Sequence, residues 1–459
     1  MSLRLLIILG IFAVSIYWTL KRPYYGVLLN IILFHLNLRV FGTGLEDIRF
    51  QFIATLALLA SMFMNSEELK EPEAPLQLPI KVLFGFTFFV FMTSTWAVSD
   101  SKLAFESALD FSKIVLFAFL MVKLVKTEDE VKILVWVLLG CIWYTSFMAR
   151  WGVEFDWIDE VEVGIATGGT GTHLMMHLPL LITLAMLGSK YERIAAYCII
   201  PFMLDGITVL PSGLRSTFVS LVVVGIAYFI LAPGKLRAKS TIPLGFGAII
   251  FLYVFVPPDY LEYMKTVLNP SSESSAASRN TINDATWEII AEYPMGIGFN
   301  NYSRISMNYL PEDNLTDEGT RDAHNAFLKT MAEFGMLGFI VWMLMFITAY
   351  FFFRRVRKAH PMNIEPNRLQ LYAFAFSVGL ISIGPGLYTH SYNDLDTLYW
   401  FVALSCILYN IEFRKQEEVG PEKKAKPSQE EMIKRARELQ EASLRNKRGP
   451  GRAAIPPLR

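Results

Sequence analysis

Apolar residues along this chain gather into long blocks that are separated by polar connections. Seven blocks are largely uncharged and long enough, or nearly so, to cross a hydrocarbon core of ~30 Å as helices; they cover residues 5–20, 82–98, 131–148, 218–231, 242–257, 334–353 and 371–387. Weaker stretches between them cover residues 26–41, 51–64, 103–124, 173–187, 191–210 and 395–411. The pattern predicts an all-α, polytopic integral membrane protein with about 12–13 transmembrane helices.

Composition agrees with this prediction. Of the 459 residues 53% are hydrophobic and 35 are Phe, and the mean hydropathy is +0.38. The first apolar block has no small-residue cleavage site after it, so we expect a retained first helix. Cys141, Cys198 and Cys406 all lie within apolar runs, which favours core positions over a disulfide framework or a zinc site. The formal net charge of zero decides nothing by itself, and we expect the lipid bilayer and no nucleic acid among the partners.

Lysine and arginine concentrate in every second connection, and this alternation predicts orientation. The basic connections contain Lys21 and Arg22, Lys70 and Lys81, Lys123 and Lys126, Lys190 and Arg193, Lys235, Arg237 and Lys239, and Arg354, Arg355, Arg357 and Lys358. The positive-inside rule places this set in the cytoplasm. We therefore expect a transmembrane domain over residues 1–411 and a charged, partly disordered cytoplasmic tail over residues 412–459.

The opposite, outer face carries one large polar loop, residues 258–323, and a smaller one at 150–172. Connections longer than ~15 residues are uncommon unless they have a function. Within the large loop, residues 281–293 read as a short amphipathic helix with Ile282, Trp287, Ile290 and Ala291 on or near one face. Pro294 would end this helix, Trp287 would anchor it at the membrane surface, and Arg279 would precede its start.

Four side chains of the outer face could converge on an anion: Arg215 at a helix start, Arg279 and Arg321 in the large loop, and His324 at its end. Taken singly, such an arginine can merely snorkel to the headgroups, and such a histidine can be an interfacial or capping residue. Taken together, the guanidinium groups suit phosphate oxygens and a neutral imidazole can take a proton from a hydroxyl. This combination indicates a transferase whose leaving group is a phosphate or diphosphate.

The chain contains no P-loop pattern, and Gly296-Ile297-Gly298 follows a predicted helix rather than a strand. A donor that is already held in the membrane would need no nucleotide cradle. We therefore expect no nucleotide cofactor.

Several motifs resemble the bacterial O-antigen ligase and polymerase superfamily of polytopic membrane glycosyltransferases. The matching segments lie between about residues 205 and 350; they are Ser-Gly-Leu-Arg215, Ser278-Arg279, Trp287, Pro294-Met295-Gly296-Ile297-Gly298, Ala323-His324-Asn325 and Glu333-Phe334-Gly335-Met336-Leu337-Gly338. The opening Arg22-Pro23-Tyr24-Tyr25-Gly26 also resembles the start of the O-glycosylation ligase branch found with exosortase systems.

The resemblance implies transfer of a glycan from an undecaprenyl-diphosphate carrier to a lipid, protein or glycan acceptor on the periplasmic face, without metal or nucleotide. Arg215 and Arg279 would hold the diphosphate, and His324 would orient or deprotonate the acceptor hydroxyl. Arg321, Asn325 and Trp287 would complete the substrate-binding set. Ligase and polymerase activities remain open, because both use the same donor chemistry.

Competing interpretations rest on other residues. His173 and His177 lie four apart and could share a metal, although no third ligand is evident, and Asp394-Leu-Asp396 has the form that metal-dependent glycosyltransferases use. Capping of the helix that starts there is the more ordinary use of these aspartates. A transporter or flippase for lipid-linked glycan would also need cations in a membrane cavity. The notable cations lie instead at helix ends and in the outer loop, which favours an enzyme.

Overall fold

The computed structural model describes residues 3–36, 45, 48–65, 76–150, 168–209, 214–256, 274–316, 319–360 and 367–418. Every secondary-structure element in this part of the chain is a helix, which confirms the all-α prediction. The chain divides into two compact units, Met1–Glu412 and Phe413–Arg459. Residues 419–459 of the second unit lie outside the described part of the chain.

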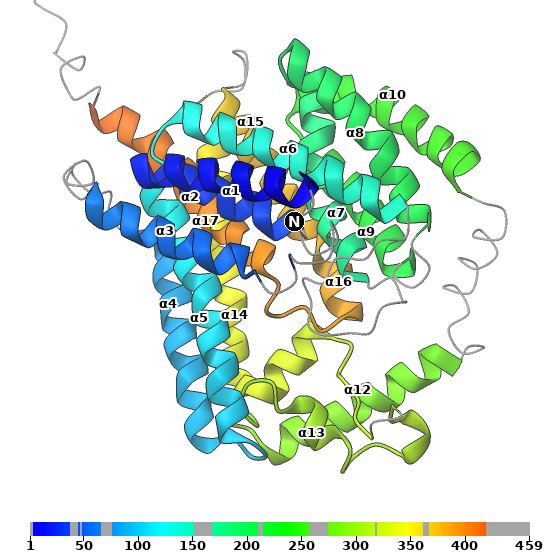
Figure 1. Cartoon of the computed structure of the whole chain (residues 1–459). Coiled ribbons are helices and arrows are strands. Elements are labelled where there is room, and N and C mark those ends of the chain that lie inside the picture. The colour runs from blue at the N-terminus through cyan, green and yellow to red at the C-terminus, as the bar shows by residue number, and fades with distance from the viewer. Residues whose placement is uncertain are drawn as a thin grey trace, which may run out of the picture. The chain divides into compact units, whose positions relative to one another are not determined.

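The first half of the chain forms successive hydrophobic helices, shown in blue to green in Figure 1. They are α1 (Leu3–Lys21), α2 (Pro23–His35), α3 (Phe50–Met64), α4 (Leu78–Thr93), the 3-10 turn η3 (Ser94–Trp96), α5 (Ser101–Leu124), α6 (Glu128–Arg150), α7 (Gly168–Leu187), α8 (Lys190–Val209), α9 (Leu214–Leu231), α10 (Gly234–Ile250) and the π-helical turn η4 (Phe251–Phe255).

The second half contains the helices of the outer loop and the last hydrophobic helices (Figure 1). They are α12 (Ser274–Glu292), α13 (Tyr302–Ser306), the 3-10 turn η7 (Glu312–Asn314), α14 (Ala326–Arg357), α15 (Arg368–Ser382), α16 (Gly384–Thr389) and α17 (Asp396–Glu418).

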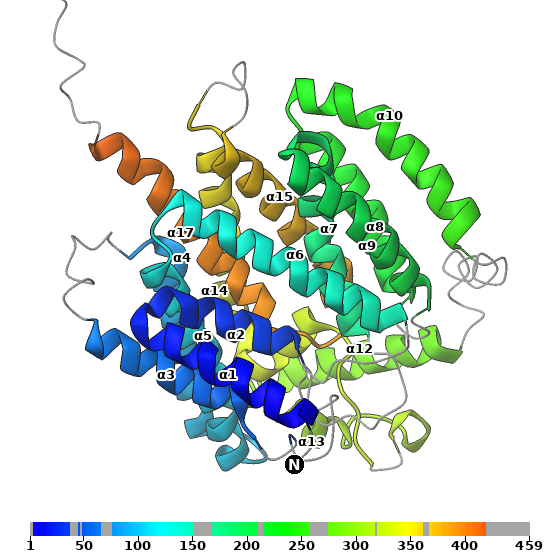
Figure 2. The ribbon, with the colours of Figure 1, turned by 45° about the horizontal axis from the view of Figure 1, so that its top comes forward.

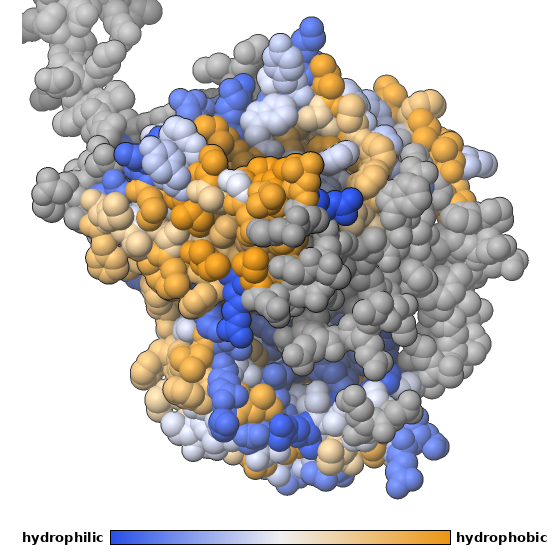
Figure 3. Space-filling view, viewed as in Figure 1, coloured by the Kyte–Doolittle hydropathy of each residue, from blue (hydrophilic) through white to orange (hydrophobic). Residues whose placement is uncertain are grey.

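Every apolar block predicted from the sequence overlaps a helix. Among the described residues, six helices are long and apolar enough to cross a membrane, and three further apolar helices are shorter. Exposed apolar side chains such as Leu6, Ile11 and Val14 of α1 face outward. Figure 3 shows the resulting hydrophobic surface over α1 and α3, whereas hydrophilic side chains gather near α13. These features confirm a polytopic membrane protein.

The hydrophobic helices pack in an order that differs from their order in the sequence. Helix α14 packs against α4 and α15, α7 packs against α15 and α9, and α6 packs against α8. Figure 2 shows α10 at the edge of this arrangement, beside α8 and α9. Side-chain stripes on helices interlock along their length, so the pairing of helices depends on shape rather than on distance along the chain.

Three buried carboxylates are paired with basic side chains at one end of the helices, which we call the basic face. Arg22 contacts Glu130 at 2.5 Å, Arg368 contacts Glu192 at 3.3 Å, and the Nε2 atom of His360 lies 2.7 Å from Glu412. These pairs join connections that the charge pattern had assigned to a single side. Arg357 belongs to the same face, because its guanidinium donates to the Leu231 carbonyl oxygen at 2.8 Å.

The outer loop docks at the other end of α14, where that helix is broken. Gly335 has φ 67° and ψ 177°, which interrupts the α-helical ladder. The carbonyl oxygens of Ala332 and Glu333 accept hydrogen bonds from the backbone N–H groups of Ile297 (2.9 Å) and Gly298 (3.0 Å). The break therefore converts α14 carbonyl groups that would bond within the helix into acceptors for the loop.

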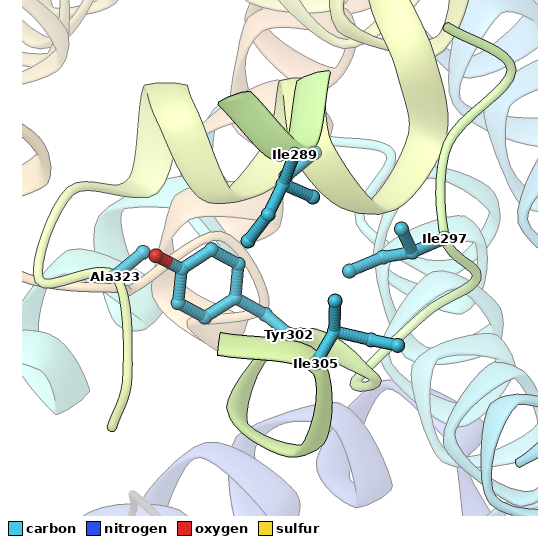
Figure 4. Packing of buried hydrophobic residues seen from close by; sticks show 6 residues of the cluster. Ile289, Ile297, Tyr302, Ile305 and Ala323 are labelled. Carbon is cyan, nitrogen blue, oxygen red and sulfur yellow. The ribbon is translucent and has the colours of Figure 1, made fainter. Parts of the chain in front are cut away.

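A small hydrophobic core holds the loop against this break. Figure 4 shows Ile289 of α12, Ile297, Tyr302, Ile305 and Ala323 packed around one centre. The hydroxyl groups of Tyr302 and Thr286 share a hydrogen bond of 2.5 Å, so the polar tip of the tyrosine is satisfied inside the core. This core packs α12 and α13 against the start of α14.

The buried face of α12 differs from the predicted one. The helix starts at Ser274 rather than near residue 281, so Arg279 lies inside it and does not precede it. Ile282, Ala285 and Ile289 are buried, whereas Trp287 is 50% exposed and Ala291 is also exposed. The helix packs against the loop core through the side that carries Ile282, Ala285 and Ile289. Trp287 lies five positions after Ile282, so it falls on another side of the helix.

Substitution of Gly335 should test the docking. A Cβ atom there would lie 2.5 Å from the Pro294 carbonyl oxygen, and the observed φ and ψ belong to a region that only glycine adopts readily. We expect Gly335→Ala to lower the free energy of unfolding by about 1–3 kcal/mol. Thermal unfolding of the purified protein in detergent measures this.

The matched control is Gly225→Ala in α9, where a Cβ atom meets nothing within 4 Å. It should leave the transition temperature unchanged or slightly raised, because alanine favours helix more than glycine does. Equal behaviour of the two variants would contradict the docking described here.

Candidate functional site

The residues of the predicted site come together where the outer loop meets α14. Asn325 is the N-cap of α14, and its Oδ1 atom accepts hydrogen bonds from the N–H groups of Phe327 (3.1 Å) and Leu328 (3.2 Å). Such a cap satisfies two of the donors that a helix start leaves unpaired. His324 immediately precedes the cap, so the end of the loop fixes its backbone position.

His324 adopts a left-handed backbone conformation with φ 48°. Positive φ is uncommon for residues other than glycine and is held only where surrounding contacts impose it. The cap on one side and Ala323, which is 1% exposed in the loop core, are such contacts.

Arg279 and His324 line the same pocket, which has a volume of about 120 Å³. Its walls come from α12, from the end of the loop and from the end of α16; they are Arg279, Asn280, Asn283, His324, Tyr388 and Thr389. The pocket is therefore lined by a guanidinium, an imidazole, two amides and two hydroxyl-bearing side chains. Such a set can bind an anion and a sugar-like polyol together.

Sequence reasoning missed His390, which follows α16. Its Nε2 atom lies 3.2 Å from the Ser216 hydroxyl, its ring stacks on Tyr392 at 4.9 Å, and its carbonyl oxygen accepts from the Ala326 N–H at 2.9 Å. His390 thus joins the start of α9 to the start of α14. The one sign in the sequence that His390 could belong to the site was its position in a short outer connection without Lys or Arg. The period of the apolar residues does not reveal a contact such as that between His390 and Ser216.

Arg215 is the second residue of α9, and its side chain lies outside the described part of the structure. Its chain neighbour Ser216 is 6% exposed and contacts His390 as described above. The backbone of Arg215 is therefore adjacent to the site.

The other predicted substrate-binding residues lie around the pocket rather than within its walls. Arg321 is partly buried three residues before His324, and its Nε atom has no hydrogen-bond partner within the described ranges. Asn325 is 4% exposed, with its oxygen committed to the cap. Trp287 projects from the exposed side of α12, where it suits an interfacial anchor.

Electrostatics keep the two histidines of the site neutral. Burial is the largest influence on His324 and lowers its pKa; Asp322 opposes this, while Arg321, Arg279 and Lys329 add to it. Burial also lowers the pKa of His390 to about 3, with smaller contributions from Arg279 and His324. At neutral pH both rings can therefore accept a proton or a hydrogen bond.

The candidate metal motifs have other surroundings. His173 and His177 pack in the core with His35, whose Nε2 atom lies 3.2 Å from that of His173. Asp396 is the first residue of α17, where a negative charge stabilises the helix start. In the part of the chain that the structure describes, no group of three or more His, Cys, Asp or Glu side chains is arranged to hold a metal ion.

Residues 200–343 match the family model described as O-antigen ligase. The matched segment contains the start of α9, the outer loop and the first part of α14, but not α16, which supplies Tyr388 and Thr389 to the pocket. No curated protein matches the chain. This match supports the resemblance to the O-antigen ligase and polymerase superfamily over the matched segment, and with it an activity like that of the O-antigen-ligase membrane glycosyltransferases.

Substitution of Asn325 should separate capping from ligand contact. Asn325→Ala removes the acceptor for two N–H groups and should lower the free energy of unfolding by about 1 kcal/mol. Asn325→Ser retains a capping oxygen and should stay close to the parent protein in thermal unfolding. A cap that is irrelevant to stability would leave both variants alike.

Proposed function

We propose that this O-antigen-ligase-like protein transfers a glycan from an undecaprenyl-diphosphate carrier to an acceptor hydroxyl at the periplasmic face of the inner membrane. The observation that carries the proposal is the pocket shared by Arg279 and His324. It places a fixed cation and a neutral base within one cavity at the outer end of α14. Nothing in the proposed reaction requires a nucleotide or a metal.

The cations suit a diphosphate leaving group. Arg279 lines the pocket and Arg215 belongs to the adjoining start of α9, so a diphosphate between them would meet guanidinium groups from two elements. Planar guanidinium groups bind phosphate oxygens in pairs of parallel hydrogen bonds. Arg321 adds positive charge nearby and supplies an Nε donor that protein groups leave unused in the described residues.

The proposed reaction is a displacement at the sugar carbon that carries the diphosphate. An oxygen of the acceptor hydroxyl forms the new bond to this carbon, and the bond to the phosphate oxygen breaks with its electron pair leaving on undecaprenyl diphosphate. A ring nitrogen of His324 accepts the hydroxyl proton. Arg215 and Arg279 stabilise the charge that develops on the leaving oxygen, which is a task for preorganised donors in a water-poor site.

Orientation follows from the two ends of α14. Its last turn carries Arg354, Arg355 and Arg357, and its first turn adjoins the pocket. From Met336 to Arg357 the helix is about 33 Å long, which matches a hydrocarbon core of ~30 Å. With the basic face in the cytoplasm, the pocket opens at the periplasmic boundary, where a polyprenyl tail can stay in the bilayer.

The remaining predicted residues receive supporting roles in the proposal. Trp287 anchors α12 at the membrane surface, and Asn325 positions His324 through the cap of α14 rather than by contacting the substrate. We assign residues 1–411 to the catalytic membrane domain and residues 412–459 to a cytoplasmic tail.

Substitution of the site residues should stop transfer without preventing insertion. Arg215→Ala and Arg279→Ala should each slow transfer about 10²–10³-fold, because a donor to the developing anion is lost. His324→Ala should slow it about 10²–10⁴-fold through loss of the base. The measurement is the fraction of glycan that remains on the lipid carrier in a deletion strain complemented with each variant.

Two controls lie outside the pocket. Arg304 is an outer-loop cation paired with Asp100 at 3.0 Å, and His360 lies on the basic face beside Glu412. Arg304→Ala and His360→Ala should transfer glycan near the parental rate. Near-normal transfer by His324→Ala would refute the role of the base.

The rate of transfer should follow the protonation of His324. Burial and the nearby cations hold its pKa below 6.5, so the imidazole is deprotonated and active at neutral pH. We expect a constant rate above about pH 7 and a decline only at a more acidic pH. Spheroplasts buffered between pH 5 and 8 permit the measurement, and a midpoint clearly above 6.5 would contradict the assignment.

The lipid-linked pool in a deletion strain decides between the two activities of the superfamily. Full-length chains retained on the carrier indicate the ligase proposed here. Single repeat units on the carrier indicate a polymerase instead.

A further inference from the structure

The base of the proposed reaction has an electrostatic difficulty. When His324 accepts a proton it becomes a cation in a partly buried position close to Arg279, Arg321 and Lys329. Each of these charges disfavours the imidazolium, and burial disfavours it further. A base that gains a proton in such surroundings needs a negative charge nearby.

Asp322 is built to supply this charge. One of its carboxylate oxygens accepts the Ala323 N–H at 2.8 Å and lies 3.4 Å from the Lys329 ammonium. The Lys329 side chain is 11% exposed and that of Asp322 is 34% exposed, so this ion pair is partly shielded from solvent and from screening by salt. Asp322 is two residues before His324 in the chain, and His324 itself has a left-handed backbone conformation.

We propose that Asp322, held by Lys329, is a positioning residue that stabilises the protonated form of His324 during transfer. This inference rests on the proposed function of His324 as the base. It assigns to the Arg321-Asp322-Ala323-His324 segment a carboxylate that acts on the imidazole through its charge, instead of a lone histidine. Lys329 would act one step removed, by fixing the carboxylate and keeping it ionised.

The groups that face His324 from every neighbouring element support this role. They are Arg279 from α12, Arg321 and Asp322 from the loop, Lys329 from α14 and His390 from the end of α16. Within this described set Asp322 is the one group that raises the pKa of His324, and His390 contributes no charge at neutral pH. Burial would raise the pKa of Asp322 itself, but Lys329, His324 and the Ala323 N–H outweigh it and hold that pKa below its usual value.

Lys329 has further negative charge close by, in Glu333 and Asp394. Loss of Asp322 therefore leaves the ammonium with other electrostatic partners. Asp322→Asn keeps the size and the hydrogen-bonding oxygen of the side chain while removing its charge. It is the variant that isolates electrostatics from packing.

The decisive experiment measures the pH profile of transfer, because a purely structural role would lower the rate without moving the profile. Spheroplasts of the deletion strain would carry the full-length parent, Asp322→Asn, Asp322→Glu or the pair Asp322→Asn with Lys329→Met. The readout is the rate at which glycan leaves the lipid carrier between pH 4.5 and 8. Immunoblots of the membrane fraction and thermal unfolding of each variant control for folding.

We expect Asp322→Asn to slow transfer at neutral pH at least ~10-fold, because a less basic imidazole is a weaker general base. The acid side of its profile should move to lower pH by roughly one unit, since removal of an adjacent opposite charge stabilises the neutral ring. Asp322→Glu keeps the charge and should retain the parental position of the profile. The double variant should have the same rate and profile as Asp322→Asn. That result would show that the effect of Asp322→Asn does not come from leaving Lys329 without its carboxylate partner.

The inference is overturned if a folded Asp322→Asn protein transfers at the parental rate, or if its rate falls while its profile stays in place. In both cases His324→Ala distinguishes failure of the role of Asp322 from failure of the role of His324. Inactive His324→Ala beside such an Asp322→Asn result removes the role of Asp322 alone. Active His324→Ala removes the proposed base and, with it, the function on which the inference rests.

Discussion

The docking of the outer loop onto the broken start of α14 is the interaction on which the site depends. Two backbone hydrogen bonds, from Ile297 to Ala332 and from Gly298 to Glu333, replace bonds that a continuous helix would have made. Gly335 permits the break, and Gly296 permits the close approach, since a Cβ atom there would lie 2.5 Å from the Glu333 carbonyl oxygen. Arg279 and His324 belong to segments 45 residues apart in numbering and meet because this contact fixes α12 against α14.

The same contact explains why the two glycine motifs of the sequence occur together. Pro294-Met295-Gly296-Ile297-Gly298 and Glu333-Phe334-Gly335 are halves of a single backbone junction. Their glycines permit the backbone conformation and the close approach of the two segments. The chemistry of the site depends on the side chains that this junction brings together. A glycine-rich segment after a helix is thus a structural device here, and no phosphate cradle is needed to account for it.

The site also shows how a membrane enzyme can hold charge at a boundary. On the basic face the carboxylates of Glu130, Glu192 and Glu412 are each paired, which serves packing at the ends of helices. At the outer end Arg279, Arg321 and Lys329 all lower the pKa of His324, so positive charge is in excess at that imidazole. Asp322 is placed where it offsets part of that excess for one particular group, His324.

Much of the architecture could be read from local pattern. Uncharged stretches of sufficient length must form helices in a bilayer, because every backbone polar group has to be satisfied within the segment. For that reason each predicted apolar block coincides with a helix, and Arg279, His324 and their neighbours could be singled out as the unusual cations and base of one face. The start of α12 was misplaced because residues 274–280 are polar and small, and their helical structure carries no amphipathic signal.

Tertiary structure decided what the site residues touch. Asn325 and Arg321 look alike as polar neighbours of His324, yet one caps a helix and the other retains an unused donor in the described part of the chain. His390 and Asp322 join the site through contacts between α9, α14 and the loop that no periodicity encodes. The sequence alone thus determined the helices and the sidedness of their charges, since both follow from transfer of each segment between water and lipid. The partnership of distant residues depended on how the helices and the loop pack, because packing responds to shape and hydrogen bonding across the whole fold.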